Sequence, residues 1–466
     1  MNQEEFIQLS GPLFEAVALS GIYSDGKTFV DAIPKSDPHE ILKTFENERD
    51  RPSFDLKTFV ETHFLLPPPS HESQLKASSM KDYIEKTWPL LRKEMKTTSK
   101  WDTLIPLPHP HTVPGGRFRE CFYWDSYFTA LGLPTPQVKE MVQNFAHLID
   151  LFGFIPNGNR IYFTSRSQPP VFSLLLKLLY DRGESDFPLS FLPYLEKEYA
   201  YWMAQTPLNS YFDDLNIPRP EAFKKETELA KALDHPQLFQ QLRATCASGW
   251  DFSSRWLADG QSLSTLRTLD LLPIDLNSFL FHLEETLFLF SDDATYREAA
   301  ERRKLDLQTL FWHHGFFYDI DLLTKEPTAA KTLAAASPLF VQAATQKQAD
   351  TVAKKLEKHF LLPGGFVTTL TESGHQWDMP NGWAPLQWIT IQGLLNYGHR
   401  DLALEGARRW LALNEKIFQE TGTLHEKYNV RDGTIEVARG EYAPQQGFGW
   451  TNGVNAALSR LLDREG

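Results

Sequence analysis

The sequence is poor in cysteine, in long apolar runs and in positive charge, and each shortage excludes a class of protein. Only Cys121 and Cys246 occur among 466 residues, far apart and in no spaced motif, so we expect neither a disulfide framework nor a thiolate metal site. No run approaches the length and apolarity of a membrane span. The formal net charge of -13 repels nucleic acids and anionic membranes and disfavours a polyanionic substrate, whereas it suits a neutral small molecule or a cation.

Motifs for nucleotide and metal binding are also missing. Neither GxGxxG nor GxxxxGK[ST] occurs, and no histidines have HExxH spacing. The run PHPH at 108–111 is more typical of an extended proline-rich surface segment than of a metal site. The N-terminus, MNQEEFIQLSGPLFEAV, has no basic region followed by a long apolar stretch, which predicts a cytoplasmic protein.

Aromatic residues, by contrast, are abundant. They make up 13% of the chain, with 12 Trp and 33 Phe, so an enclosed pocket should be lined partly by rings. The length allows one large domain or two to three ordinary ones, with ample material for a deep core. No low-complexity linker divides the chain, and HFLLPPPSHESQLKASS at 63–79 is the segment most like a joint.

Apolar residues recur at helical spacing over much of the chain. Over 135–152, Thr135-Pro136 marks a helix start and Gly153 marks its end. The same plan predicts a helix over 169–183, with prolines before it and glycine after it. Several predicted helices are apolar on more than one face, which implies burial between neighbouring helices. Further helices are predicted over 188–205, 276–291, 293–312, 338–360, 385–397, 400–420 and 452–463.

Strand signals are few and short. GFFYDID at 315–321 and GTIEV at 433–437 have the composition of local strands. The chain is therefore predicted to be mostly α-helical. Helices without a fixed short repeat can form either a toroid of helix pairs or a solenoid, and periodicity leaves both arrangements open.

Six regions between the predicted helices place aromatic rings beside ionisable or amide groups. Sugar hydroxyls need acceptors and planar donors of this kind, and the apolar face of a sugar ring packs on Trp, Tyr or Phe. Glycoside cleavage also needs two carboxyl groups, one protonated and one ionised. The regions are PGGRFRECFYWDSYF (114–128), PNGNRIYFTSRSQPP (156–170), PRPEAF (218–223), ASGWDFSSRW (247–256), QWDMPNGWAP (376–385), and TLHEKYNV (423–430) together with RGEYAPQQGFGWTNG (439–453).

Each of these motifs also has a simpler structural interpretation. A lone WD is usually a buried tryptophan beside a solvated or capping aspartate, and PGGRF alone is more typical of a tight turn followed by a salt-bridging arginine. HEKY resembles an exposed helix end, and RSQPP resembles a helix start. The functional interpretation depends on all six regions occurring together.

In combination the motifs resemble the trehalases, the glycoside hydrolases of family 37 that split α,α-trehalose into two glucoses. PGGRFRECFYWDSYF and QWDMPNGWAP resemble the two signature stretches of that family. SGWDFSSRW, PNGNR, RSQPP, PRPE, HEKYNV and GFGWTNG match the family in the same order, and GPLFEAVALSGIYSDGKTFVDAIPK extends the match toward the N-terminus. The resemblance, to the cytoplasmic type, implies an all-α (α/α)6 barrel at 76–466 with an N-terminal segment at 1–75 packed on it. It also implies a single catalytic domain that acts as a monomer on a disaccharide, with no nucleic-acid or membrane partner.

The resemblance further implies hydrolysis with inversion and without a metal or organic cofactor, in which Asp251 is the general acid and Glu426 the general base. The two carboxyls of such an enzyme stand roughly 6.5–9.5 Å apart, with room for one water. Positive charge near Glu426, which lies between His425 and Lys427, would keep that base ionised. By the same resemblance the substrate-binding residues are Arg117, Trp124, Asp125, Asn157, Arg166, Ser167, Gln168, Arg219, Pro220, Glu221, Gly249 and Glu441.

The chain departs from the family pattern at three places. Phe122 stands where the family often has Tyr, and Ala247 stands where an acidic residue is common. The usual glycine-rich run before EY is replaced by EVARGEY, which puts the behaviour of that loop as a lid in doubt. Two other readings stay open at this point: a related (α/α)6 glycosidase acting on another α-glucoside, and a sugar-binding or scaffold protein with a degenerate site.

Overall fold

Six helices form a closed inner ring in the computed structural model, which describes residues 5–68, 75–94, 99–205, 209–233, 235–435, 442 and 444–465. Each inner helix packs on the next around the ring, and the sixth returns to the first. In ring order they are α6 (Tyr123–Ala130), α8 (Phe172–Asp181), α13 (Ile274–Ser291), α15 (Ser337–Phe340, which continues a 3-10 turn at Leu333–Ala336), α17 (Ala384–Asn396) and α19 (Gly449–Glu465).

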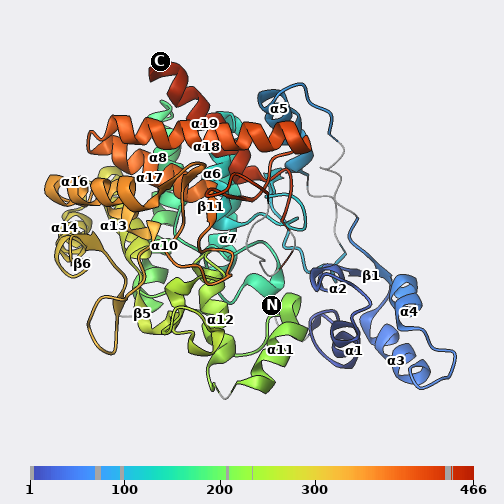
Figure 1. The fold of residues 1–466 in the computed structure, drawn as a ribbon. Helices are drawn as coiled ribbons and strands as arrows, with labels where there is room; N and C mark the ends of the chain where they lie inside the picture. Colours follow the sequence, from blue (N-terminus) through green and yellow to red (C-terminus); the bar gives the residue numbers. More distant parts are fainter. Residues whose placement is uncertain are drawn as a thin grey trace.

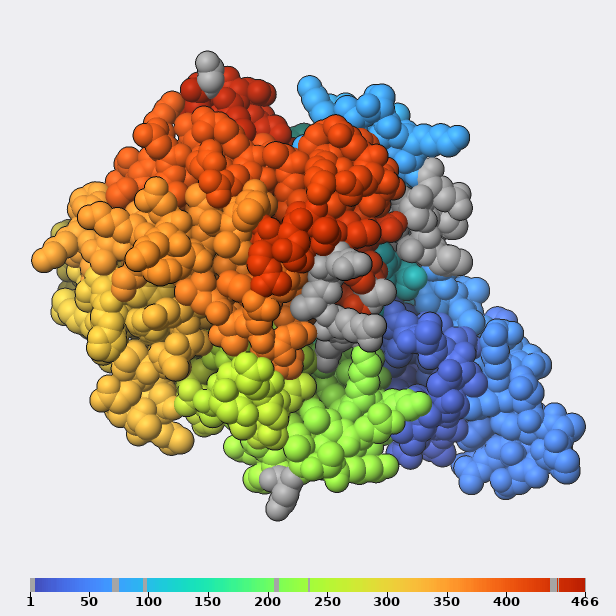
Figure 2. Space-filling model, in the orientation of Figure 1, coloured from blue at the N-terminus to red at the C-terminus, as the bar shows by residue number. Residues whose placement is uncertain are grey.

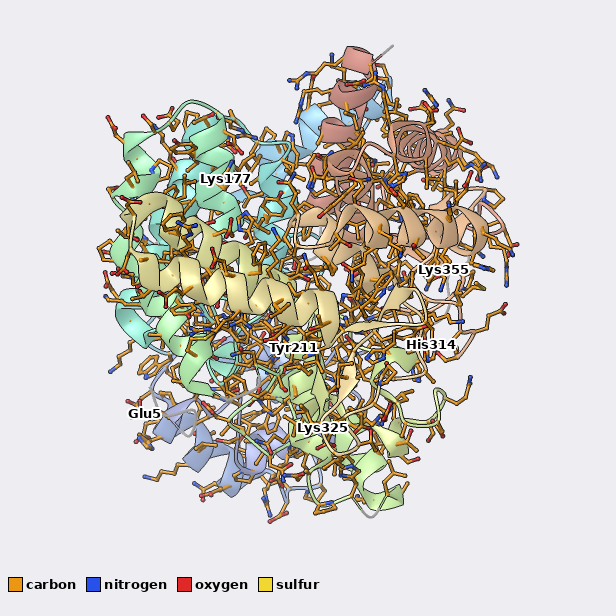
Figure 3. All side chains as sticks on the ribbon, turned by 90° about the vertical axis from the view of Figure 1, so that its left-hand side faces the viewer. Glu5, Lys177, Tyr211, His314, Lys325 and Lys355 are labelled. Carbon is orange, nitrogen blue, oxygen red and sulfur yellow. The ribbon has the colours of Figure 1, made fainter. Side chains whose placement is uncertain are left out.

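An outer helix precedes each inner helix in the chain, so the molecule contains six helix pairs (Figure 1). This arrangement is the (α/α)6 barrel, and it decides in favour of the toroid over the solenoid. The outer helices are α5 (Met80–Leu91), α7 (Thr135–Phe152), α10 (Leu192–Gln205), α14 (Ala294–Thr309), α16 (Gln346–Lys355) and α18 (Arg400–Thr421). From the side, Lys177 of α8 and Lys355 of α16 lie on opposite sides of the view, and Glu5 lies at its lower left (Figure 3).

Burial explains why the inner helices lack a polar stripe. Every residue of α6 is buried, and α13 and α17 are buried over most of their length. The outer helices α7 and α18 are instead amphipathic, and they end at Gly153 and Gly422, whose left-handed conformation closes the last turn. The predicted apolar helices are therefore confirmed as the wall of the barrel.

Two predicted helices are divided. The region 188–205 contains the end of α9 (Asp186–Leu189) followed by α10, and 338–360 contains the end of α15 followed by α16 and a π-helical turn at Leu356–Phe360. The second break is fixed by a capping box, in which Thr345 and Gln348 exchange side-chain to backbone hydrogen bonds and start a new helix. The predicted start of α7 also differs, because Thr135 is its first helical residue and makes no cap hydrogen bond.

The strands of the described residues are two or three residues long and pair antiparallel. β6 (Trp312–His313) pairs with β7 (Phe316–Phe317), and β8 (Ile320–Asp321) pairs with β5 (Leu271–Leu272), so the prediction for 315–321 is confirmed. Of the prediction for 433–437, Thr434 makes an isolated bridge to Asn429, and the remainder from 436 lies outside the described residues. The other pairs are β1 (Ile33–Pro34) with β2 (Phe64–Leu65), β3 (Arg92–Lys93) with β4 (His111–Thr112), β9 (Leu361–Leu362) with β10 (Gly365–Phe366), and β11 (Asn381–Trp383) with β12 (Lys427–Asn429).

Long and short connections lie at opposite ends of the barrel. An inner helix is joined to the next outer helix by a short segment, such as 131–134, 292–293 or 397–399. An outer helix is joined to its inner partner by a long one, and the α10–α13 connection includes α11 (Phe223–Ala232) and α12 (Leu238–Ala247). The long connections meet where the inner helices begin, and the six motif regions of the sequence lie in these connections and in the first turns of α6, α17 and α19.

The N-terminal segment lies against this same end of the barrel. It consists of α1 (Pro12–Ser20), α2 (Lys27–Val30), α3 (Pro38–Glu48) and α4 (Leu56–His63), drawn in blue beside the green α11 (Figure 1). The space-filling view shows the blue segment in direct contact with the green residues (Figure 2). Its buried apolar residues join the same hydrophobic core cluster as those of the barrel, and the Phe14 ring meets the Phe223 ring edge-on at 4.9 Å.

Candidate active site

A pocket of about 640 Å³ opens where the long connections and the N-terminal segment meet, within the range of roughly 300–1,000 Å³ typical of small-molecule sites. Of the described residues predicted from the sequence to act in catalysis or substrate binding, all but Ser167 line this pocket. The residues that line it are Arg117, Trp124, Asp125, Asn157, Arg166, Gln168, Arg219, Pro220, Glu221, Gly249, Asp251 and Glu426.

Glu426 is a buried carboxylate held at both oxygens. Tyr442 donates its hydroxyl to Oε1 at 2.7 Å, and the Lys427 ammonium lies 3.1 Å from Oε2. The backbone is fixed as well, because the Glu426 N–H donates to the Gln445 carbonyl and the Trp450 indole N–H donates to the Glu426 carbonyl. Donors at both oxygens fix the orientation of the carboxylate, as a general base that must reach a water requires.

The positive charge beside Glu426 comes from Lys427 and not from His425. Burial lowers the pKa of His425 to about 4, so this imidazole is neutral near pH 7. Lys427 begins β12, opposite Trp383 of β11, and its ammonium lies 4.9 Å from the Trp383 ring centroid. The strand pair therefore fixes the lysine, and the lysine fixes the carboxylate.

Asp251 follows α12 and lines the pocket after a tight glycine turn. Gly249 has a φ of +76°, and a Cβ there would lie 3.2 Å from the Trp124 indole nitrogen. The backbone thus passes close against Trp124, which a larger residue would prevent. The Cys246 Sγ lies 3.9 Å from the Asp251 Oδ2.

Gln376 connects the loops of the two candidate catalytic carboxyls. Its side-chain N–H donates to the Asp251 carbonyl, while its Oε1 accepts from the Lys427 ammonium at 2.7 Å. Analysis of the sequence singled out the QWDMPNGWAP motif but gave Gln376 no role. A polar amide between two charged loops has no signature in a single sequence, since its partners lie 125 and 51 residues away.

Asp378, of the same motif, anchors the Asp251 loop. It is completely buried, and its carboxylate accepts from the Ser254 backbone N–H at 2.7 Å and from the Ser253 and Ser254 hydroxyls at 2.8 Å each. Thr369 and Ser373 donate two further hydroxyls to it. Asp378 is therefore not the solvated or capping aspartate that a lone WD motif suggests, and it does not line the pocket. Its role is to fix the backbone that follows Asp251.

Asp125 lies in the first turn of α6, where the sequence had been interpreted as loop. Burial and the negative charges of Glu426 and Asp251 raise its pKa well above the ordinary value for aspartate. Asp125 and the two candidate catalytic carboxyls line the same pocket. A neutral Asp125 can both donate to and accept from a sugar hydroxyl. Its neighbour Trp124 contributes a buried indole whose Nε1 has no hydrogen-bond partner among the described residues.

Arg117 is held by the N-terminal segment. Its guanidinium donates to the Asp25 carboxylate in a fork, from Nε at 2.9 Å and from Nη2 at 2.6 Å. Burial alone would raise the pKa of Asp25, but its hydrogen bonds to Arg117 and the charge of that residue lower it. The guanidinium carbon also lies 4.8 Å from the Tyr442 ring centroid.

The other two arginines are held by partners in the loops around them. Arg166 donates from Nε to the Asn157 side-chain oxygen at 2.7 Å and forms an ion pair with the buried Asp213. Arg219 pairs through Nε with Glu226 and donates to the Cys246 sulfur at 2.8 Å.

Glu221 has a carboxylate oxygen that can still accept a hydrogen bond. Its Oε1 lies 3.9 Å from the Arg166 guanidinium, and its buried Oε2 makes no hydrogen bond within the described residues. This oxygen suits a ligand hydroxyl. Gln168 instead accepts the Trp124 backbone N–H at 3.1 Å, which fixes the start of α6.

One described site residue, Ser167, does not line the pocket. The Ser167 hydroxyl donates to the Ile155 carbonyl at 2.7 Å, so its side chain stabilises the loop. Glu441 lies outside the described residues.

Stacked indoles form one wall of the site. Trp377 and Trp383 are parallel with ring centroids 3.8 Å apart, and Trp250 stacks on Trp377 at 5.5 Å. Trp450 meets Trp383 edge-on. Of these four indoles, Trp377, Trp383 and Trp450 line the pocket and supply apolar surface beside the carboxyls, as sugar binding requires.

Comparisons with known proteins agree with this geometry. The sequence model of the family described as Trehalase matches residues 21–463. The periplasmic trehalases of Citrobacter koseri and Salmonella newport are each 41% identical over 97% of this chain, which spans 86% of their length. The prediction of a cytoplasmic protein is therefore wrong, because the relatives that match over 97% of this chain are named periplasmic trehalases. None of the helices in the described ranges has the length and apolarity needed to cross a bilayer.

Solved structures show the same barrel. The neutral trehalase of Saccharomyces cerevisiae superimposes with a TM-score of 0.65 at 26% identity, covering 79% of this chain and 76% of that one. A GH63 mannosylglycerate hydrolase of Thermus thermophilus superimposes with a TM-score of 0.55 at 17% identity, covering 82% of this chain and all of that one, which is a likeness of fold.

Proposed function

The chain belongs to the trehalase family and is a trehalose-hydrolysing glycoside hydrolase, and we propose that Asp251 and Glu426 cleave the bond with inversion. The observation that carries this proposal is the fixed, doubly hydrogen-bonded Glu426 facing the same pocket as Asp251. In this scheme Asp251 protonates the glycosidic oxygen, and Glu426 takes a proton from the water that attacks the opposite face of the anomeric carbon. One glucose leaves as the β-anomer, and the other keeps its α configuration.

The surrounding groups divide the work of holding the sugar. The stacked indoles and Trp124 pack against ring faces, while Asp125 and Glu221 hydrogen-bond to hydroxyls. Arg117, Arg166 and Arg219 form the cationic side of the pocket and share their donors between the protein carboxylates and the substrate. Asn157, Gln168, Pro220 and Gly249 shape the pocket, and Ser167 and Glu441 remain substrate-binding residues by family resemblance alone.

We further propose that the N-terminal segment at 1–75 and the barrel at 76–466 form one catalytic unit, acting as a monomer. Support comes from the shared hydrophobic core and from the Asp25–Arg117 fork, which ties the segment to the pocket. Because the relatives are named periplasmic trehalases, we also propose a periplasmic location for this chain.

Substitution of the two carboxyls tests the mechanism. Asp251→Asn and Glu426→Gln should each lower kcat for trehalose by at least about a thousandfold, since each removes a proton-transfer group and weakens the charge balance of the site. Glu140→Gln is a matched control, because this carboxylate forms an Arg92 ion pair away from the pocket and its loss should leave kcat unchanged. Either active-site variant with near-normal turnover would remove that residue from the mechanism.

A substrate panel tests the specificity. Trehalose should be cleaved much faster than maltose, kojibiose or sucrose by the purified protein. Preference for another α-glucoside would assign the site to a related (α/α)6 glycosidase, and no cleavage of any of them would favour a sugar-binding protein.

A further inference from the structure

The N-terminal segment reaches into the pocket although it belongs to none of the six helix pairs. Residues of α1, α2 and the turn between them line the pocket. Gly26 lies so close to the loop of Glu221 that a Cβ at this position would be 2.2 Å from the Glu221 carbonyl oxygen. The backbone of the segment at Gly26 is therefore packed directly against the backbone of the pocket wall at Glu221.

Asp25 makes one of the polar contacts between this segment and the barrel, beside the ion pairs of Lys27 with Glu120 and of Asp31 with Arg160. Its two oxygens accept from Nε and Nη2 of Arg117, at 2.9 and 2.6 Å. Paired hydrogen bonds of this kind fix the plane of a guanidinium as well as its position. Asp25 is about one-third exposed, so the pair stands at the rim of the pocket and not in its floor.

The fixed guanidinium lies against the ring of Tyr442. The Arg117 guanidinium carbon is 4.8 Å from the ring centroid, within the range of a cation–π contact. Phe118 meets the same ring edge-on at 5.2 Å. The Lys427 ammonium lies 5.2 Å from the same ring centroid. Together these three contacts fix where the Tyr442 hydroxyl can lie.

That hydroxyl donates to Oε1 of Glu426 at 2.7 Å. Burial and the negative charges of Glu426 and Asp251 raise the pKa of Tyr442 well above its ordinary value, so the phenol stays protonated and remains a donor. Among the described residues, Tyr442 and Lys427 are the donors to this carboxylate. The acids Asp125, of α6, and Asp251, of the α12–α13 connection, line the same pocket as Glu426.

We propose that Asp25 is a positioning residue for the base: it holds Arg117 against Tyr442, and Tyr442 in turn orients the Glu426 carboxylate toward the attacking water. This inference rests on the proposed role of Glu426 as the general base. It assigns the N-terminal segment a part in catalysis, through contacts that run from Asp25 to the reacting atoms without Asp25 touching them.

Kinetics of single and double variants test the chain of contacts. Asp25→Asn should lower kcat about tenfold, the size of effect expected when one charge-assisted hydrogen bond is weakened, and should leave KM nearly unchanged. Tyr442→Phe should lower kcat by at least as much. In both variants the acidic limb of the kcat–pH profile should move to higher pH, because the Glu426 carboxylate loses a hydrogen bond that favours its ionised form.

The double variant Asp25→Asn/Tyr442→Phe separates a relay from two independent effects. If Asp25 acts through Tyr442, the double variant should have a kcat within about twofold of Tyr442→Phe alone. Multiplying effects, or an acidic limb that stays in place in Asp25→Asn, would overturn the proposal. If Asp25→Asn does not fold, Asp25→Glu, which keeps the charge but displaces the carboxylate by one methylene, serves as the same test.

Two controls keep the interpretation specific. Glu140→Gln removes a carboxylate from the comparable fork with Arg92, at 2.6 and 2.9 Å, and should leave both kcat and the pH profile unchanged. Glu426→Gln separates this inference from the proposed function. An inactive Glu426→Gln beside a normal Asp25→Asn refutes the positioning role alone, whereas an active Glu426→Gln refutes the role of the base.

Discussion

Replacement of Gly249 by alanine tests the close approach of backbone and indole at the acid loop. At a φ of +76° an alanine would adopt the left-handed backbone conformation, which destabilises the folded state by about 1–2 kcal/mol. The new Cβ would also lie 3.2 and 3.3 Å from Nε1 and Cε2 of the Trp124 indole, so the ring or the loop must move by a few tenths of an ångström. Since a displacement of 1 Å near reacting groups can cost about a hundredfold, we expect kcat/KM for trehalose to fall about tenfold.

Gly153 provides the matched control. It has a φ of +80° after α7, and a Cβ there would meet no atom within 4 Å. Gly153→Ala should therefore lower Tm by about as much as Gly249→Ala and leave kcat/KM unchanged. Glucose release at several trehalose concentrations, together with thermal unfolding of both variants, makes the comparison. Equal activity of Gly249→Ala and Gly153→Ala would refute the view that the indole contact shapes the pocket.

Two further predictions concern buried carboxyls outside the pocket. Asp378→Asn turns a buried acceptor of the Ser254 backbone N–H into a donor and should displace the Asp251 loop. We expect kcat to fall about a hundredfold and the free energy of unfolding to fall by about 2–3 kcal/mol. An unchanged kcat would show that Asp378 is not needed to hold the loop. Burial raises the pKa of Glu198, which accepts from the Tyr123 hydroxyl, to about 8 from an ordinary 4.5. Between these two pH values the folded protein keeps a proton on Glu198 that the unfolded chain releases, so the free energy of unfolding should decline as pH rises from 4.5 to about 8. Denaturant titrations of Glu198→Gln should show a smaller decline over this pH range. The same decline in the variant and the unaltered protein would contradict the assignment.

The wall of the barrel could be predicted from the sequence because burial and helical period coincide there. Helices such as α13 and α17 are apolar all round, and a helix of that kind must lie between other helices. The ring itself could not be predicted from periodicity, since closure depends on α19 packing against α6, more than three hundred residues earlier in the chain. Resemblance to the family supplied the closure.

Helix α6 was missed for a physical reason that also marks the site. Its polar residues are as buried as its apolar ones, because Tyr123 donates to Glu198 of the outer helix α10 and Asp125 lines the pocket. The resulting pattern of rings and charges has no apolar stripe, so it resembles a loop. Local pattern fails here because the partners of each polar group come from other connections.

The support around the catalytic carboxyls was equally hidden. Lys427 could be noticed because it adjoins Glu426, and Tyr442 follows 16 residues later, but Asp25 and Gln376 lie 92 and 51 residues from the partners they hold. Their hydrogen bonds link residues whose proximity only the folded barrel creates. Sequence motifs therefore identified the groups that line the pocket more completely than the groups that hold them.

The most direct test of the account is the stereochemistry of the first turnovers on trehalose. Proton NMR at early times, before mutarotation, resolves the anomeric signals of newly released glucose. Hydrolysis with inversion by Asp251 and Glu426 predicts α- and β-glucose in equal amounts. An initial excess of α-glucose would contradict inversion, and no glucose release would contradict the function itself.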